Sequence, residues 1–223
     1  MRLSIPTQPP ENDAELLERC QRIEGLTFYQ LAHFLQRSIP VSSLRRKGWA
    51  GLAIEKALGA CAGSAAQPDF PHLGIELKTL PLNKQGLPSE STFVTSINLL
   101  KAHEENWRNS VCWQKLKKVL WIPIEGEKEI PYNERRIGQG FLWYPSVEQA
   151  RILERDWTEH MENITCGRLE EIDARMGEYL QVRPKAADAK SLCQGFNAKG
   201  YLIQTLPRGF YLRSSFTKQV LYK

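Results

Sequence analysis

The stretch that most restricts how this chain can fold runs from Ile75 to Leu80, where apolar and polar residues alternate as they do along a β-strand. Side chains on a strand repeat every two residues, so Glu76 and Lys78 project from the same face. Asp69 stands seven residues before Glu76. If Asp69 lies on a neighbouring turn or strand, two carboxylates and one ammonium group converge at this strand.

Two carboxylates and a lysine are the minimum set for hydrolysing a phosphodiester with Mg²⁺. Carboxylate oxygens hold this hard cation, which keeps several waters and an open side for a phosphate. The cation polarises the phosphate and lowers the pKa of a bound water, while the lysine can place that water or stabilise charge. The spacing resembles the PD-(D/E)xK motif of restriction-type nucleases. Taken alone, the motif could also be an exposed strand whose polar side chains face the solvent.

Length and composition are those of a soluble globular protein. The 223 residues suffice for one large domain or two small lobes, and 42% hydrophobic with 25% charged residues is ordinary for a soluble protein. No apolar stretch reaches the ~18 residues of a membrane span, and the N-terminus lacks the apolar core of a secretory signal. The five cysteines form no Cys-x-x-Cys pair, so we expect free, mostly buried thiols in a reducing cytoplasm.

Positive charge is concentrated at the C-terminal end. From Arg175 to Lys223 the chain carries nine Lys or Arg and two acids, Glu178 and Asp188, a balance of +7. The whole chain has a net charge of +5, so the preceding residues together carry −2. This asymmetry indicates that the C-terminal part faces a polyanion, with a solvated basic surface as the alternative.

Periodicity predicts a mixed α/β or α+β fold with strands clustered after the first helices. Helices are expected at 13–24, 27–37, 48–58, 146–163 and 167–175, with N-caps at Asp13, Thr27 and Ser146 and with Gly25 and Gly59 as stops. Strands are expected at 73–80, 91–99, 117–124, 141–144 and 178–182, followed by a basic loop at 183–190 and a hairpin of 201–206 with 209–213.

Glu55 stands among apolar residues of the helix expected at 48–58. A carboxylate in such a place needs a partner or a metal, or must face water. An exposed helix face is the more common outcome for a single Glu.

Several blocks in order along the chain resemble the MutH family of DNA mismatch repair endonucleases. The resemblance spans most of the chain, and its blocks are KGW at 47–49, Glu55, GACAGS at 59–64, PDF at 68–70, LGIELKT at 73–79, KLKKVLWIP at 115–123, GEYLQVRPKAA at 177–187 and LPRGFYL at 206–212.

The resemblance implies a restriction-endonuclease-like fold, in which a mixed β-sheet is flanked by helices and two lobes form a DNA cleft. It implies one endonuclease domain over 1–223, with an N-terminal catalytic lobe and a basic C-terminal DNA-reading lobe. The implied reaction is a Mg²⁺-dependent nick at GATC sites of hemimethylated DNA, on the unmethylated strand. The implied activator is MutL, working with MutS and ATP.

The family's catalytic roles match positions in this chain. Asp69 and Glu76 match metal-binding carboxylates, and Lys78 matches the catalytic lysine. Glu55 matches a helix-borne acid that supports the metal site. Lys115 matches a lysine that is important for activity, and a contact to a backbone phosphate is the alternative for it.

The family's DNA-contacting roles match five further residues. Arg183, Pro184 and Lys185 match the block that reads the GATC bases, since Arg and Lys suit guanine and apolar groups suit the thymine methyl. Phosphate contacts are the alternative for the two basic residues. Tyr211 matches the sensor of adenine methylation, with a core tyrosine as the alternative. Lys47 matches a DNA contact beside the active-site helix, and could equally be a solvated helix start.

Two other functions are alternatives to a nicking endonuclease. A restriction enzyme that cuts both strands commonly dimerises, whereas one motif without an obvious dimer helix favours a monomeric nicking enzyme. A non-catalytic DNA-binding module is the second rival, against which the presence of Glu55, Asp69, Glu76 and Lys78 argues. Because GATC sites are frequent, we expect weak binding and slow cleavage by the protein alone. The chain ends at Lys223, so the partner and lobe-movement role linked to longer family tails is in doubt.

Overall fold

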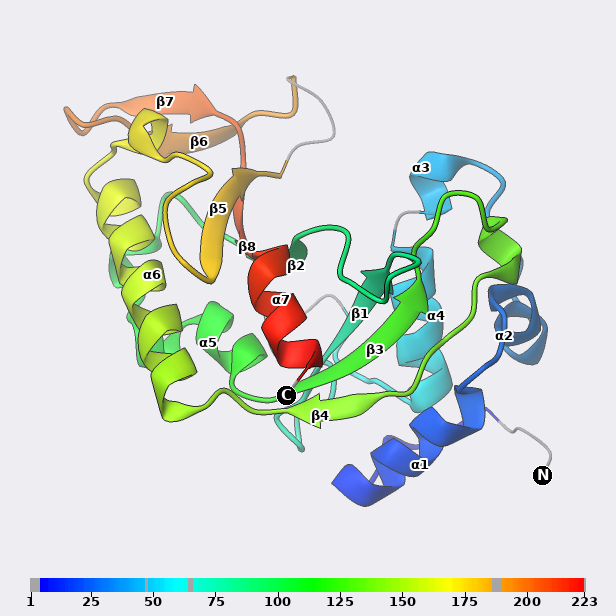
Figure 1. Ribbon diagram of the computed structural model, residues 1–223. Helices are drawn as coiled ribbons and strands as arrows, with labels where there is room; N and C mark the ends of the chain where they lie inside the picture. The colour runs from blue at the N-terminus through cyan, green and yellow to red at the C-terminus, as the bar shows by residue number, and fades with distance from the viewer. Residues whose placement is uncertain (1–4, 47, 64–65, 186–189, 223) are drawn as a thin grey trace. The chain divides into compact units, whose positions relative to one another are not determined.

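The computed structural model describes residues 5–46, 48–63, 66–185 and 190–222, which form two compact units (Figure 1). The first unit contains residues 1–89 and 118–144, and the second contains 90–117 and 145–223. Each unit is therefore built from two separate stretches of chain. Both units contain helices and strands, which confirms the mixed α/β class.

A three-stranded mixed sheet forms the centre of the first unit. Its order is β1 (Glu76–Leu82), β3 (Val119–Glu125) and β4 (Phe141–Trp143). β1 and β3 are parallel, and β4 is antiparallel to β3. Parallel neighbours need a long crossover connection, and here the crossover contains the first stretch of the second unit.

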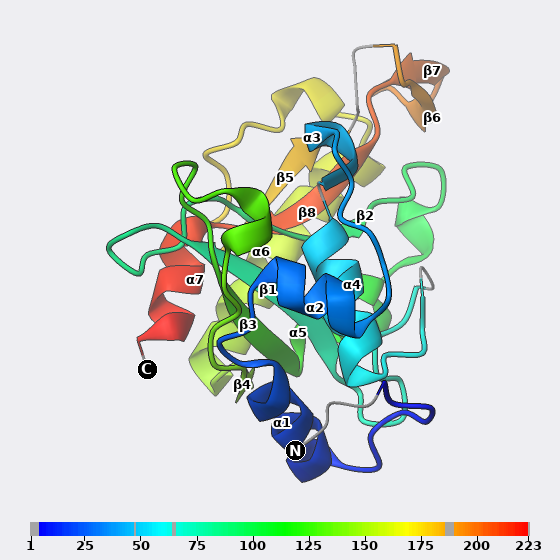
Figure 2. The same ribbon diagram turned by 90° about the vertical axis from the view of Figure 1, so that its right-hand side faces the viewer.

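Helices pack on one side of this sheet, as Figures 1 and 2 both show for α1 (Asp13–Ile23), α2 (Phe28–Phe34) and α4 (Trp49–Leu58). Two shorter turns complete the unit, α3 (Ser43–Arg46) and the 3₁₀ helix η3 (Tyr132–Glu134). The shared core joins apolar side chains of the helices to those of the strands, including Leu16, Ile23, Phe28, Leu31, Ile54, Leu58, Leu77, Leu120 and Ile122.

Helix ends follow the predicted signals with one exception. Thr27 caps α2 through a capping box with Gln30, and Gly59 ends α4. The predicted cap of α1 at Asp13 is wrong. Asn12 has the extended backbone of a cap and accepts the Glu15 N–H, whereas the Asp13 carboxylate lies 2.8 Å from Lys118 Nζ.

The second unit contains two antiparallel sheets. The larger has the order β2 (Thr92–Ser96), β8 (Arg208–Leu212) and β5 (Leu180–Pro184), and the smaller pairs β6 (Cys193–Phe196) with β7 (Leu202–Thr205). The helices are α5 (Val111–Leu116), α6 (Val147–Thr165) and α7 (Ser214–Leu221), with 3₁₀ turns η1 (Ala102–Glu104), η2 (Trp107–Asn109) and η4 (Leu169–Glu171). Ser146 caps α6 as predicted.

Two predicted elements of this unit are wrong. β7 and β8 exist, but they do not form a hairpin, because β7 pairs with β6 while β8 pairs with β2 and β5. The buried side chains of Phe210 and Leu212 place β8 in the larger sheet. The helix expected at 167–175 is reduced to η4, and the Arg213 side chain binds backbone carbonyls of the segment that follows η4.

All five cysteines are free thiols, as predicted. The expectation that most are buried is wrong: Cys20 and Cys112 are buried, Cys61 and Cys166 are exposed, and Cys193 is half-buried. Burial raises the pKa of the Cys20 thiol to about 12, which makes it unreactive near neutral pH. No helix within the described ranges has the length and apolar character needed to cross a membrane.

The C-terminal end of α4 packs closely against α1 at Gly59. Arg19 of α1 donates from Nη1 to the carbonyls of Leu58 (2.8 Å) and Gln8 (3.0 Å). Gly59 has φ +85°, and a Cβ added there would lie 2.5 Å from Arg19 Nη1 and 3.1 Å from Gln8 O. A side chain at this position would therefore strain the backbone and displace the guanidinium of Arg19.

We predict that Gly59→Ala lowers the free energy of unfolding by about 2–4 kcal/mol, because the left-handed backbone costs about 1–2 kcal/mol and the displaced hydrogen bonds add to it. Gly25→Ala is the matched control, since Gly25 has φ +76° and nothing within 4 Å of an added Cβ. Chemical denaturation of the three proteins measures the difference. Equal losses for both variants would contradict the role assigned to Arg19.

Candidate active site and DNA-reading face

A tight loop brings Asp69 against the first residues of β1. Phe70 and Ile75 form an antiparallel bridge, with backbone hydrogen bonds of 2.9 and 3.2 Å. The residues just outside this bridge are Asp69 and Glu76. Asp69 Oδ2 accepts the Leu77 N–H at 2.8 Å, and the Asp69 side chain is buried with a residue exposure of 7%. The Asp69 carboxylate is thereby held beside the strand between Glu76 and Lys78.

Glu76 and Lys78 share a face of β1, as the alternation predicts. Lys78 Nζ lies 2.6 Å from Glu76 Oε1, and the residue exposure of Glu76 is 2%. Burying a carboxylate is unfavourable unless a cation or hydrogen-bond donors compensate its charge. The lysine supplies that compensation here, and the pair is fixed on a strand whose other face enters the core through Leu77.

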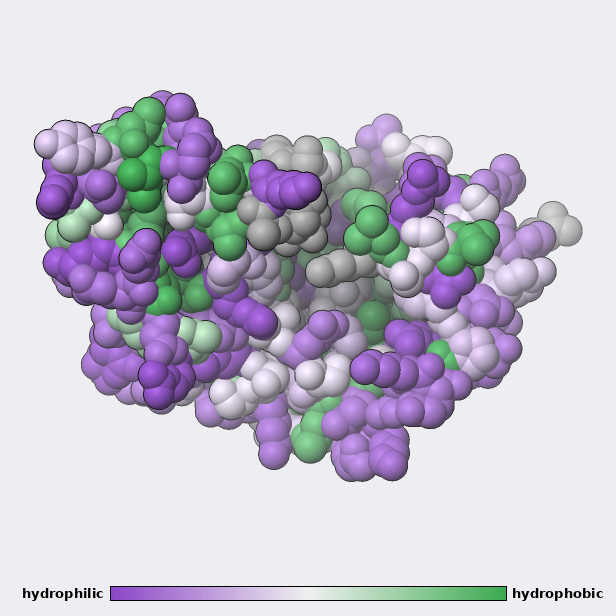
Figure 3. All heavy atoms as spheres, turned by 90° about the horizontal axis from the view of Figure 1, so that it is seen from above, coloured by the Kyte–Doolittle hydropathy of each residue, from purple (hydrophilic) through white to green (hydrophobic). Residues whose placement is uncertain are grey.

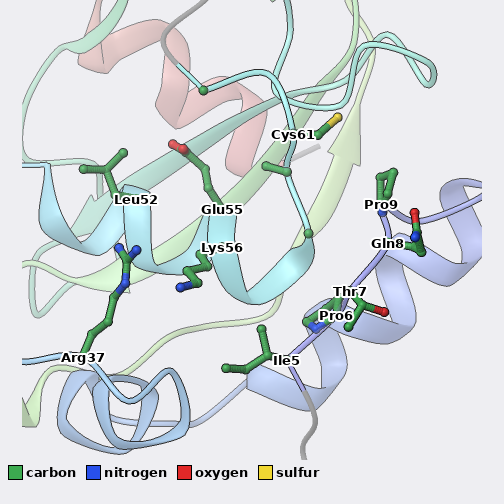
Figure 4. A pocket seen from close by; sticks show the side chains of 13 residues that line it. Ile5, Pro6, Thr7, Gln8, Pro9, Arg37, Leu52, Glu55, Lys56 and Cys61 are labelled. Atoms are coloured by element: carbon green, nitrogen blue, oxygen red, sulfur yellow. The ribbon is translucent and has the colours of Figure 1, made fainter.

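Glu55 lies on the outer side of α4 at the rim of a pocket of about 360 Å³. Figure 4 shows its carboxylate pointing away from Lys56 and Arg37, which line the same pocket. Its neighbours Ile54 and Ala57 face the core instead. The helix therefore places Glu55 on its half-exposed face.

The carboxylates of Asp69, Glu76 and Glu55 have the chemistry that Mg²⁺ prefers, although they do not form a complete set of protein ligands around one position. In the part of the chain that the structure describes, no three His, Cys, Asp or Glu side chains are grouped so that they could hold a metal ion. The predicted metal set of Asp69, Glu76 and Glu55 is thus not assembled. Mg²⁺, however, is commonly bound through one or two carboxylates, with waters and substrate phosphates completing its shell. Asp69 and Glu76 meet that smaller requirement.

Lys115 lies in the last turn of α5, in the second unit, and is half-buried. Lys47 lies outside the described residues.

The second unit gathers the predicted base-reading residues at the end of one sheet. Arg183 and Pro184 are the last residues of β5, and not part of a loop as predicted. The Lys185 N–H still bonds Pro207 O at 2.7 Å, which extends the pairing by one residue. Residues 186–189 of the predicted basic loop lie outside the described ranges.

Aromatic rings and hydroxyls hold these cations in place. Arg183 donates to Ser91 Oγ at 2.8 Å, and its guanidinium lies 5.7 Å from the centre of the Tyr211 ring. Lys185 Nζ lies 3.7 Å from the centre of the Phe93 ring and 3.1 Å from Ser96 Oγ. Cations over aromatic faces are stabilised by the ring quadrupole. The result is an ordered face with both charged and apolar groups.

Phe93 was not identified from the sequence. Its ring contacts Tyr211 edge-on, with centres 5.2 Å apart, and it also carries Lys185. Gly209 provides the space, because a Cβ there would lie 2.9 Å from Phe93 Cε2. The available signal was an aromatic residue two positions from Ser91 and two from Thr95, on the same face of an expected strand.

Burial raises the pKa of the Tyr211 hydroxyl, and the nearby Arg183 opposes that rise. The phenol therefore stays neutral near physiological pH and presents a rigid, uncharged ring edge.

A buried acid on α6 anchors the start of β5. Asp156 is fully buried, and its Oδ2 accepts backbone N–H groups of Glu178 (2.8 Å), Tyr179 (2.6 Å) and Leu180 (3.0 Å). His160, one turn later, places Nε2 3.2 Å from Leu180 O and packs edge-on against Phe210. These contacts fix the strand that ends at Arg183 and Pro184, the residues predicted to read bases.

We predict a pH-dependent contribution of His160 to stability. Burial lowers its pKa below 6.5, so the folded protein keeps this imidazole neutral while the unfolded chain takes up a proton. The stabilisation is present above pH 6.5 and is lost as the pH falls toward the folded-state pKa. Unfolding free energies between pH 7.5 and 5.5 measure it.

His160→Gln should show a smaller loss of stability over this range than the wild type. Phe210→Leu alters the packing on the same ring without removing the titrating group, so its pH profile should stay closer to that of the wild type than the His160→Gln profile does. Parallel pH profiles for wild type and His160→Gln would refute the assignment.

Comparison with known proteins agrees with this geometry. The family model described as DNA mismatch repair enzyme MutH matches residues 58–156. A DNA mismatch repair protein MutH of Pasteurella multocida is 53% identical over 212 residues, covering 95% of this chain and 96% of the relative. Those of Histophilus somni and Haemophilus influenzae are 51% and 49% identical, each covering at least 95% of both chains.

Proposed function

The chain belongs to the MutH family of DNA mismatch repair endonucleases, and from this premise we propose that it nicks the unmethylated strand of hemimethylated GATC sites with Mg²⁺. The observation that carries the proposal is the buried cluster on β1, where Asp69 accepts the Leu77 N–H and Glu76 pairs with Lys78. Hydrolysis of a phosphodiester needs carboxylates for a metal and a cation near the attacked phosphate, and this cluster offers both.

Each residue of the cluster has a proposed role. Asp69 and Glu76 would hold the metal, and Glu55, on the half-exposed face of α4, would support it from the neighbouring helix. Bound Mg²⁺ would supply Lewis-acid polarisation of the phosphate and a more acidic water. Lys78 shares the Glu76 face, so its ammonium can orient the attacking water and stabilise negative charge on the phosphate. Lys115 is proposed to assist, either there or at a backbone phosphate.

Sequence recognition is proposed for the ordered face of the second unit. Arg183 and Lys185 can donate to guanine O6 and N7, and Pro184 offers an apolar contact for a thymine methyl. The support is that both cations are held by hydroxyls and aromatic rings, which limits the positions their donors can occupy. Lys47 is proposed as a further DNA contact.

Tyr211 is proposed as the methylation sensor. An N6-methyl group on adenine is detected by steric fit, which requires a ring that does not move aside. Tyr211 is held between Arg183 and Phe93, and its strand pairs with β2 and β5 on both sides. Phe93 is thus proposed to position this ring.

Because GATC sites are frequent, an unregulated nicking enzyme would cut DNA at many places, so we propose that the activity is regulated. We propose that the protein is a monomer with little activity alone and that MutL activates it, with MutS and ATP acting upstream. We also propose that it works in the reducing cytoplasm, an environment in which its five free thiols would stay reduced. A restriction enzyme cutting both strands is the competing proposal, and a binding module without catalysis is a weaker one for a member of an endonuclease family.

We predict that Glu76→Gln lowers nicking of unmethylated GATC plasmid by at least about a hundredfold, since even changes beyond the direct ligands of a metal cost 10–100-fold. Supercoiled plasmid with Mg²⁺, MutL and ATP gives the rate as open circles. Glu134→Gln is the matched control, because Glu134 is an exposed acid of η3 in the same unit. DNA binding by Glu76→Gln should remain close to that of the wild type.

The products separate the competing functions. Open circles indicate nicking, whereas linear DNA indicates paired cuts. Full activity of Glu76→Gln would contradict the proposed active site. A wild type that binds DNA without cleaving it under any condition would favour the binding module.

We predict that Tyr211→Ser nicks methylated and unmethylated plasmids at more similar rates than the wild type, because the steric test at adenine is removed. Phe93→Leu should shift the ratio in the same direction by less, since the Tyr211 ring remains but loses its edge contact. Rates on fully methylated and unmethylated plasmid provide the ratio. Retained discrimination in Tyr211→Ser would remove that residue from its role.

A further inference from the structure

The β6–β7 hairpin carries large apolar side chains on its outer face. The exposed fractions are 39% for Phe196, 67% for Tyr201 and 54% for Leu202, and Phe196 pairs with Leu202 across the strands. Leu192, just before β6, is 50% exposed. In the view from above, apolar side chains reach the surface in this part of the second unit (Figures 1 and 3). Exposed apolar groups that are clustered commonly mark a contact surface.

The same segment is exclusively basic. From residue 189 to 207 it contains Lys190 and Lys199 and no Asp or Glu. Both lysines are exposed, and the Lys199 ammonium makes no hydrogen bond or ion pair with any described residue. The charge therefore suits an anionic partner.

A rigid turn presents Lys199. Asn197 Oδ1 accepts the N–H groups of Lys199 and Tyr201, both at 3.0 Å, and Asn197 O accepts the Gly200 N–H at 2.8 Å. Gly200 has φ +77°, which the turn requires. The lysine and the neighbouring tyrosine are thus displayed together at the end of the hairpin.

The hairpin is seated firmly on the rest of its unit. A Cβ added to Gly195 would lie 3.3 Å from Leu99 and 3.4 Å from Leu169, so the inner face of β6 packs closely. A Cβ on Gly167, just after α6, would lie 2.2 Å from the Asn197 backbone, so the turn contacts the end of that helix. Such a platform loses little conformational freedom when it binds.

Both ends of the hairpin segment connect to the proposed base-reading face. β5 precedes it and β8 follows it, and the Pro184–Arg208 pair with the Lys185 N–H to Pro207 O bond closes its base. The hairpin is therefore continuous with the residues proposed to contact GATC.

We propose that the β6–β7 hairpin is a second DNA-contacting element, which binds the sugar-phosphate backbone of the duplex beside the recognised site. Lys199 and Lys190 contact phosphates, and Tyr201, Phe196 and Leu202 lie along apolar sugar edges. This contact carries no base sequence information, because phosphates and sugars are common to all sequences. The inference rests on the proposed placement of DNA at Arg183 and Tyr211.

Duplex DNA fits the hairpin better than a protein surface does. A docking protein would satisfy the apolar side chains, but the two exposed lysines and the connection of the segment to the strands proposed to read bases both point to the polyanion.

The test is equilibrium binding of fluorescent duplexes, with and without GATC, over a range of salt concentrations and without Mg²⁺. Lys199→Ala should weaken binding on the order of fivefold for both sequences and reduce the slope of log K against log salt by about 0.9, the value for one phosphate contact. Tyr201→Ser should weaken binding without changing that slope. Lys218→Ala on α7 is the matched control, since Lys218 is also an exposed lysine of this unit.

Wild-type affinity and salt slope in Lys199→Ala would overturn the proposal. Unchanged DNA binding combined with weaker activation by MutL would instead assign the hairpin to a protein contact. Because no cleavage is measured, failure of the catalytic proposal leaves the hairpin test intact. A wild type without preference for GATC but with hairpin-dependent affinity would reject base reading while supporting the hairpin.

Discussion

The first unit depends on compensating two buried carboxylates at one end of β1. Asp69 and Glu76 are each more than nine-tenths buried, where an unpaired charge would be strongly unfavourable. One accepts a backbone N–H and the other pairs with Lys78, so each acidic side chain is tied to the strand itself. The parallel β1–β3 pairing and the helical layer against Leu77 hold that strand, so folding also brings together the groups that we propose to be catalytic.

The second unit uses the same principle for a different purpose. Asp156 is buried on α6, and three backbone N–H groups at the start of β5 satisfy it. The opposite end of this short strand carries Arg183 and Pro184. In both units, then, a buried acid fixes the backbone within a few residues of the side chains that face DNA in our proposal. Local hydrogen bonding thereby limits how far those side chains can move.

The mistaken predictions have different causes. Periodicity identified β7 and β8, but their short separation suggested a hairpin that the structure does not contain. Strand pairing depends on where apolar side chains can be buried, and Phe210 and Leu212 find their core between β2 and β5. The cap of α1 lies one residue earlier than predicted, because Asn12 accepts the Glu15 N–H, while Asp13 pairs with Lys118 of a distant segment. The strand-pairing error concerns partners that adjacent residues do not reveal, whereas the cap error is a choice between two neighbouring residues that could both serve as caps.

Local sequence patterns predicted most of the helices and strands and the residues proposed for the site. Alternation placed Glu76 and Lys78 on one face, spacing brought Asp69 near them, and the ordered blocks identified the family, because these properties depend on residues close in the chain. Only the tertiary structure decided which strands pair, that Phe93 supports Tyr211 and Lys185, and that β6 and β7 expose an apolar face. The physical reason is that such contacts join residues far apart in the chain, whose packing depends on the whole core and not on any local pattern.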